Sequence, residues 1–87
     1  MDRYLIETPH TAEDCELLVH AIHALGFLHN FEWGCGSGVH SGWAIIEAES
    51  EAQARLAVPP LARSKAHVVK LNKFEISDLK SLHDVNP

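Results

Sequence analysis

The chain has 87 residues, 46% of them hydrophobic, and a formal net charge of −5 with the histidines neutral. This length indicates a single small domain over residues 1–87, and the hydrophobic content excludes disorder of the whole chain. The acidic balance argues against nucleic-acid binding, which needs a cationic surface to neutralise phosphates. Neither an apolar run long enough for a bilayer nor a leader peptide is recognisable, so we expect a cytoplasmic protein with no membrane partner.

The chain has two cysteines and seven histidines, and the histidine content is the unusual number in the composition. Cys15 and Cys35 do not form a CxxC pair, which excludes a zinc ribbon and a thioredoxin-type site. The expected reducing compartment also argues against a disulfide between them. A chain this short often gains stability from a partner, a metal or an oligomer.

The first strand and the first helix are predicted over the N-terminal part of the chain. Residues 3–8 alternate and are β-rich, and Pro9 ends this strand. Thr11 is a good N-cap for a helix over residues 12–25, which Gly26 stops. Apolar residues recur at helical spacing and predict a buried stripe of Cys15, Leu18, Val19, Ile22 and Leu25.

A hairpin is predicted in the centre of the chain. Residues 27–35 and 39–48 are expected as the second and third strands, although residues 27–30 also fit a loop. Gly36-Ser37-Gly38 lies between them and supplies the backbone freedom that tight hairpin turns need.

The length of this turn decides which side chains face one another. With a connection of two or four residues, Cys35 lies opposite His40 and Trp33 opposite Gly42, so that a large ring covers a strand glycine. With a three-residue loop, Cys35 lies opposite Val39 and His40 moves to the other face. We favour the first register.

A second helix follows the hairpin. Ser50 caps it, Gln53 completes a capping box, and Glu51 is placed to pair with Arg55 four residues later. Proline ends it at Val58-Pro59-Pro60, because proline cannot continue the helical hydrogen bonds.

The remaining elements complete a known plan. Residues 61–65 are a connector, residues 66–74 a fourth strand and residues 75–83 a short C-terminal helix. The order β-α-β-β-α-β predicts a ferredoxin-like α+β domain, with a four-stranded antiparallel sheet and two helices on one face. Consecutive apolar residues at 43–46 and 68–69 indicate that both faces of these strands are covered, and a second copy's sheet is the simplest cover. We therefore expect a sheet-to-sheet homodimer.

The plan, the length and two sequence blocks, GWAIIEAESEAQAR over residues 42–55 and KAHVVKLNKF over residues 65–74, resemble the small dimeric α+β-barrel proteins. These include muconolactone-isomerase-like and antibiotic-monooxygenase-like proteins and a nickel-binding bacterial group. The resemblance implies sheet-to-sheet pairing and a small molecule or metal bound near the barrel. It carries over no catalytic residue, because no catalytic motif aligns with this chain, and the architecture hosts unrelated activities.

Cys35 and His40 are the first candidates for site chemistry. A thiolate and an imidazole suit zinc, nickel or copper, and His29 shares the strand parity of Cys35 as a third candidate ligand. His10 lies just past the first strand, where ligand-site loops often lie. Cys35 and His40 could also act as a nucleophile and its base. A third alternative is structural: a small buried cysteine and a hairpin histidine exposed to water.

Aromatic residues of the hairpin are the second candidate site. Trp33, Trp43 and Phe31 could line a pocket for a small apolar ligand. Two functions follow: a homodimeric binding protein for a transition metal or small ligand, or a cofactor-independent isomerase or monooxygenase-like enzyme for a hydrophobic carbonyl compound. In the second, His40 or Glu47 would move protons. The sequence leaves open whether the protein is an enzyme.

Overall fold

The computed structural model describes residues 1–78 of the chain. Its strands and helices, in chain order, are β1 (Asp2–Glu7), α1 (Cys15–Ala24), β2 (Phe31–Trp33), β3 (Gly42–Ala48), α2 (Glu51–Arg55), α3 (Pro60–Arg63) and β4 (His67–Lys70). Short 3₁₀ turns lie at Leu28–Asn30, Cys35–Ser37 and Ile76–Asp78. The last turn falls within the helix predicted over residues 75–83; Glu75 is not helical, and residues 79–83 of that prediction lie outside the described residues.

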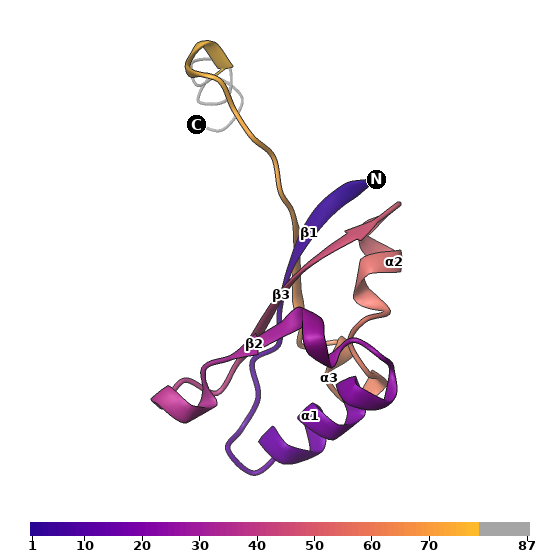
Figure 1. Cartoon of the computed structure of the whole chain (residues 1–87), viewed down its shortest axis with the longest axis vertical. Coiled ribbons are helices and arrows are strands. Elements are labelled where there is room, and N and C mark those ends of the chain that lie inside the picture. Colours follow the sequence, from indigo (N-terminus) through magenta and orange to yellow (C-terminus); the bar gives the residue numbers. More distant parts are fainter. Residues whose placement is uncertain (79–87) are drawn as a thin grey trace.

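The four strands form one antiparallel sheet in the order β2-β3-β1-β4. All three helices lie on one side of this sheet, and the other side is open (Figure 1). The predicted α+β class and four-stranded antiparallel sheet are therefore confirmed, and the arrangement is compatible with a ferredoxin-like fold. The additional helix, α3, occupies the predicted connector because Pro60 begins it, where the fixed φ of proline suits a helix start.

Alternation along β1 builds the core between the sheet and the helices. Tyr4, Ile6 and Thr8 are buried, whereas the residues between them are only partly buried and belong to the open side. Ile6 packs with Leu18 and Ile22 of α1, which are fully buried. The end of β1 and the helix α1 are therefore held against each other, and the chain between them carries His10.

α1 is shorter than predicted. The hydroxyl of Thr11 accepts a hydrogen bond from the amide of Asp14 at 3.3 Å, but the chain forms a turn here and the regular helix begins at Cys15. Gly26 ends the helix as predicted, with φ at 84° in the left-handed region that favours glycine. Leu25 lies beyond the last helical residue and is 43% exposed rather than part of a buried stripe.

α2 begins and pairs as predicted. The hydroxyl of Ser50 accepts from the amide of Gln53 at 3.1 Å, and Arg55 Nη2 donates to Glu51 Oε1 at 2.9 Å. Arg55 Nη1 also donates to the carbonyl of Ala66 at 2.8 Å. One guanidinium therefore fastens α2 to the chain that enters β4.

The hairpin has the favoured register. Phe31 pairs with Ala44 and Trp33 pairs with Gly42, as the two- or four-residue connection requires. β2 nevertheless ends at Trp33, earlier than predicted, because the chain curls into the 3₁₀ turn Cys35–Ser37. A Cβ built on Gly42 would lie 2.7 Å from ring carbons of Trp33, so the indole covers the glycine closely.

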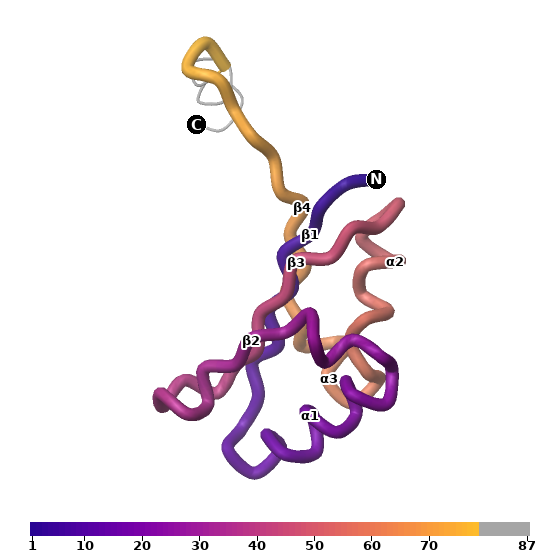
Figure 2. Tube along the Cα trace, viewed as in Figure 1, coloured from indigo at the N-terminus to yellow at the C-terminus, as the bar shows by residue number. Residues whose placement is uncertain are grey.

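The open side of the sheet carries a row of apolar side chains. Leu5 on β1 pairs with Ile45 on β3 and with Val69 on β4, so the three lie side by side across the sheet. Ile45 and Val69 are each 53% exposed. Beyond β4 the chain leaves the body as an extended segment (Figure 2), on which Phe74 and Ile76 are exposed.

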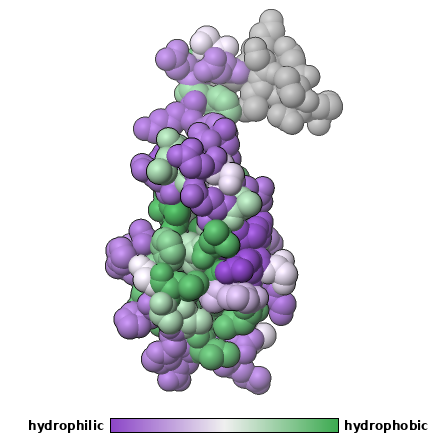
Figure 3. Space-filling view, turned by 90° about the vertical axis from the view of Figure 1, so that its right-hand side faces the viewer, coloured by the Kyte–Doolittle hydropathy of each residue, from purple (hydrophilic) through white to green (hydrophobic). Residues whose placement is uncertain are grey.

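The opposite, helix side of the molecule has a mixed surface. Apolar residues are concentrated over the body, and polar residues predominate at its edges and along the C-terminal segment (Figure 3). Within residues 1–78, no helix has both the length and the apolar character needed to span a membrane.

Candidate metal centre

The backbone brings three potential ligands into one row at the edge of the sheet. The pairing of β1 with β3 continues past the strands, since the amide of Thr8 donates to the carbonyl of Gly42 at 2.8 Å and the amide of His10 to that of His40 at 3.0 Å. On the other side of His40, extending the β2–β3 register beyond Trp33 leads to Cys35, which itself lies in the 3₁₀ turn Cys35–Ser37 and not in the strand ladder. His40 therefore lies between His10 and Cys35, two residues that are distant from each other in sequence.

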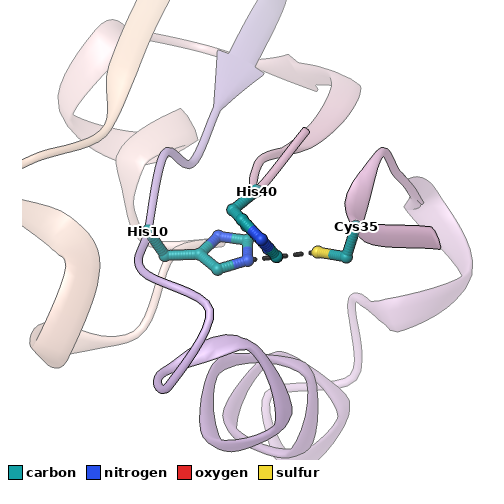
Figure 4. A group of neighbouring side chains, drawn as sticks. All are labelled: His10, Cys35 and His40. Atoms are coloured by element: carbon teal, nitrogen blue, oxygen red, sulfur yellow. Dashed lines mark hydrogen bonds between the residues drawn. The ribbon is translucent and has the colours of Figure 1, made fainter. Parts of the chain in front are cut away.

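The three side chains converge on one point. His10 Nε2 lies 3.2 Å from Cys35 Sγ, and one ligand atom from each of His10, Cys35 and His40 can be chosen so that all lie within 4.8 Å of one another. Figure 4 shows the two imidazoles and the thiol pointing toward one another, with a helix below them. His10 and Cys35 are half-buried and His40 is exposed, so the group opens to solvent on the His40 side.

The other nitrogen of His10 is held by the backbone. His10 Nδ1 lies 2.8 Å from the carbonyl oxygen of Thr8. A carbonyl can only accept, so Nδ1 carries the proton and Nε2 of the neutral ring presents its lone pair to Cys35. A histidine ligand whose second nitrogen donates to a backbone carbonyl is the usual arrangement around bound metals. The ring is also flanked by Trp33, edge-on, with centroids 5.9 Å apart.

Cys15 contacts Cys35 through its thiol. Its thiol, on the first residue of α1, donates to Cys35 Sγ at 2.9 Å, and both cysteines are free. This hydrogen bond raises the pKa of the Cys15 thiol, and burial and the charges of Cys35 and Glu16 act in the same direction. The sequence placed Cys15 in the helix stripe, and its contact with Cys35 follows only from the docking of α1 against the hairpin.

The distances fit a small coordinated ion. Zinc binds sulfur at about 2.3 Å and imidazole nitrogen at about 2.0 Å, so two such ligands on one ion are about 3.6 Å apart at tetrahedral angles and at most about 4.3 Å. The separation of His10 Nε2 from Cys35 Sγ, 3.2 Å, is close to the tetrahedral value. The largest separation within the group, at most 4.8 Å, exceeds the tetrahedral value by up to about 1.2 Å, so binding needs a side-chain movement of about an ångström, which the exposure of His40 allows.

The other histidine proposed from the sequence lies elsewhere. His29 is exposed in the 3₁₀ turn Leu28–Asn30 and borders a hollow of about 470 Å³ on the open side of the sheet. The structure therefore brings Cys35 and His40 together with His10, which the sequence indicates separately as a loop candidate, and leaves His29 outside the group. The sequence indicates His10 only by its place just past the first strand; its position beside His40 follows from the β1–β3 register, which the sequence does not determine.

The three hairpin aromatic residues lie on two faces of the sheet. Phe31 is buried in the core and stacks on Trp33 with centroids 5.7 Å apart. Trp43 lies on the open side, where it borders the 470 Å³ hollow with Leu5 and Ile45. The three side chains thus do not share a cavity.

Comparisons of the chain with protein-family models, with curated protein sequences and with solved structures found no match. Function is therefore argued from the geometry of the candidate metal centre.

Proposed function

We propose that this protein binds one transition-metal ion through His10, Cys35 and His40. The observation that carries the proposal is their position in one row, with mutually close ligand atoms and with His10 Nδ1 tied to the Thr8 carbonyl at 2.8 Å. A preset imidazole orientation is a feature of metal-ligating histidines and reduces the ordering that binding requires.

The ligand set favours a borderline-soft ion. One thiolate and two imidazoles suit zinc, nickel or copper, whereas magnesium and calcium prefer oxygen ligands. Three protein ligands leave one tetrahedral position for water or a small molecule. The exposed side of His40 gives that position access to solvent.

The alternative, a cofactor-independent enzyme, has less support. It needs the aromatic residues and a proton-transferring group in one cavity. Neither proton-transfer candidate lines the hollow that Trp43 borders: His40 belongs to the group around His10 and Cys35, and Glu47 is not part of the lining. The hollow does hold two other titratable side chains, His29 and Glu32, but of the three aromatic residues only Trp43 borders it. A metal-binding role uses the residues that are close together and is therefore preferred.

The working form of the protein is proposed to be a homodimer joined through the open sheet face. Two apolar features support a second copy as the partner: the row of Leu5, Ile45 and Val69, and the extended segment that exposes Phe74 and Ile76. The segment points away from its own body (Figure 1), and its exposed apolar side chains suit the apolar open face of a second copy. The metal group lies on the other side of the sheet and is complete within one chain.

Metal analysis of protein purified without a histidine tag tests the binding proposal. We expect one equivalent of zinc, nickel or copper, and a loss of affinity of more than about 100-fold when His10, Cys35 or His40 is replaced by alanine. His29→Ala is the matched control, because it removes an exposed imidazole outside the group. Equal metal loss in His29→Ala and His40→Ala, or less than a tenth of an equivalent bound by the wild type, would overturn the proposal.

A further inference from the structure

Cys35 lies next to a second thiol, that of Cys15, and is followed by a solvent-exposed turn. Cys15 Sγ is 2.9 Å from Cys35 Sγ and donates its hydrogen toward it. Gly36, Ser37 and Gly38, which follow Cys35, are all exposed. A small reagent can therefore approach Cys35 from the side of the turn. Cys15, on α1, is already close enough to react with the modified Cys35.

We propose that Cys15 and Cys35 are a redox-active pair, which closes to an intramolecular disulfide on reaction with a low-molecular-weight disulfide and thereby switches off metal binding. The loss of metal binding in this proposal rests on the proposed function. The closure itself depends on the two sulfurs and not on an ion.

The chemistry is a pair of thiol–disulfide exchanges. The Cys35 thiolate attacks one sulfur of the reagent, a new S–S bond forms, and the first reagent thiolate leaves. The Cys15 thiolate then attacks Cys35 Sγ, the protein disulfide forms, and the second reagent thiolate leaves. The two cysteines lose two electrons, the reagent disulfide gains them, and the two protons of the cysteines end on the released thiols.

Closure removes a ligand from the metal group. A sulfur in a disulfide carries no thiolate charge and is a poor metal ligand, because metals in cysteine sites bind the deprotonated sulfur. Cys35 supplies the sulfur of the His10–Cys35–His40 group. The same sulfur therefore serves either the ion or Cys15, and a bound ion protects it from the reagent.

Oxidised glutathione and cobalt(II), a visible substitute for zinc, test the proposal on the full-length protein. Reduced, metal-free wild type should lose the mass of two hydrogen atoms without gaining glutathione, and should then bind cobalt at least 100-fold more weakly until a reductant is added. Cys15→Ser should bind cobalt as the wild type does and accumulate glutathione on Cys35. Cys35→Ser should lose strong cobalt binding and should not form the intramolecular disulfide.

The outcomes separate the two proposals. If reduced wild type binds no cobalt, the metal-binding proposal fails, and the mass measurement still decides whether the disulfide closes. Wild type that keeps a stable glutathione adduct, or oxidised protein that binds cobalt unchanged, would overturn the redox proposal. Loss of cobalt from Cys15→Ser would make Cys15 a ligand and overturn its assignment as the second thiol of the exchange.

Discussion

His40 lies between the other two candidate ligands, because the amide of His10 donates to its carbonyl and Cys35 comes from the turn of the same hairpin. The proximity of Cys35 could be predicted, since it depends on the length of a glycine-rich turn only a few residues long. The pairing with His10 could not, because it depends on the register of two strands that are far apart in the chain. The contact of Cys15 with Cys35 could not be predicted either, because no local sequence pattern indicates where a helix packs against the rest of the chain.

Glu7 is a second residue whose chemistry follows from its position. Its carboxylate accepts from Trp43 Nε1 at 2.9 Å and lies 3.1 Å from His67 Nδ1. These partners lie on β3 and β4, so one side chain links three strands on the open face. The hydrogen bond from Trp43, followed by that from His67, holds the pKa of Glu7 below its usual value.

The lowered pKa predicts acid sensitivity. Because Glu7 has a lower pKa in the folded chain than in the unfolded chain, its contacts stabilise the fold above the unfolded-state pKa, and this contribution is lost as the pH falls through the folded-state pKa. We expect Glu7→Gln to lower the Tm at neutral pH, and the difference from wild type to shrink in acid. Thermal unfolding across this range checks the prediction, and a difference independent of pH would contradict it.

At the scale of elements, the hairpin is better predicted than the helices around it. The glycine turn and the covering of Gly42 by Trp33 follow from residues close in sequence, and both are observed. α1 begins later than expected although Thr11 makes a capping contact. The capping hydrogen bond stabilises a turn before the helix. The regular helix covers the residues that pack on the sheet, among them Leu18 and Ile22, because most helix stability comes from such packing.

The covered glycine gives an element-scale prediction. A Cβ at Gly42 would meet Trp33 ring carbons at 2.7 Å, whereas one at Gly36 would meet nothing within 4 Å. We expect Gly42→Ala to lower the free energy of unfolding by about 1–3 kcal/mol, as overpacking does, because Trp33 stacks on Phe31 and must move. Gly36→Ala is the control and should change it little. Urea unfolding of both variants is the measurement. Equal free energies of unfolding would show that the close approach of Trp33 to Gly42 does not limit the size of the residue at position 42.

At the scale of the whole molecule, the proposed assembly depends on the face that the helices leave open. The sequence predicted that apolar residues of the third and fourth strands would point away from the helices, and Ile45 and Val69 do so. It could not determine which member of each apolar pair is exposed, because that depends on the pairing register. Ile46 and Val68 pack against the core instead.

The dimer prediction has a matched control. Ile45 is 53% exposed on the open face, and Leu56, at the end of α2 on the helix side, is 56% exposed. We expect Ile45→Asp to dissociate a wild-type dimer and Leu56→Asp to leave it intact, since only the first places a charge in the interface. Light scattering after size-exclusion chromatography measures this. A wild type that is monomeric at micromolar concentration, or the same mass for both variants, would refute the proposed interface.

The central claim is that one ion is held by one sulfur and two imidazoles of the same chain. X-ray absorption spectroscopy of the reduced, zinc-loaded protein tests it most directly. We predict one sulfur at about 2.3 Å and two imidazole nitrogens at about 2.0 Å, with the sulfur shell absent in Cys35→Ala and one imidazole fewer in His10→Ala or His40→Ala. Zinc surrounded only by oxygen and nitrogen in the wild type, or a shell unchanged in these three variants, would contradict the claim.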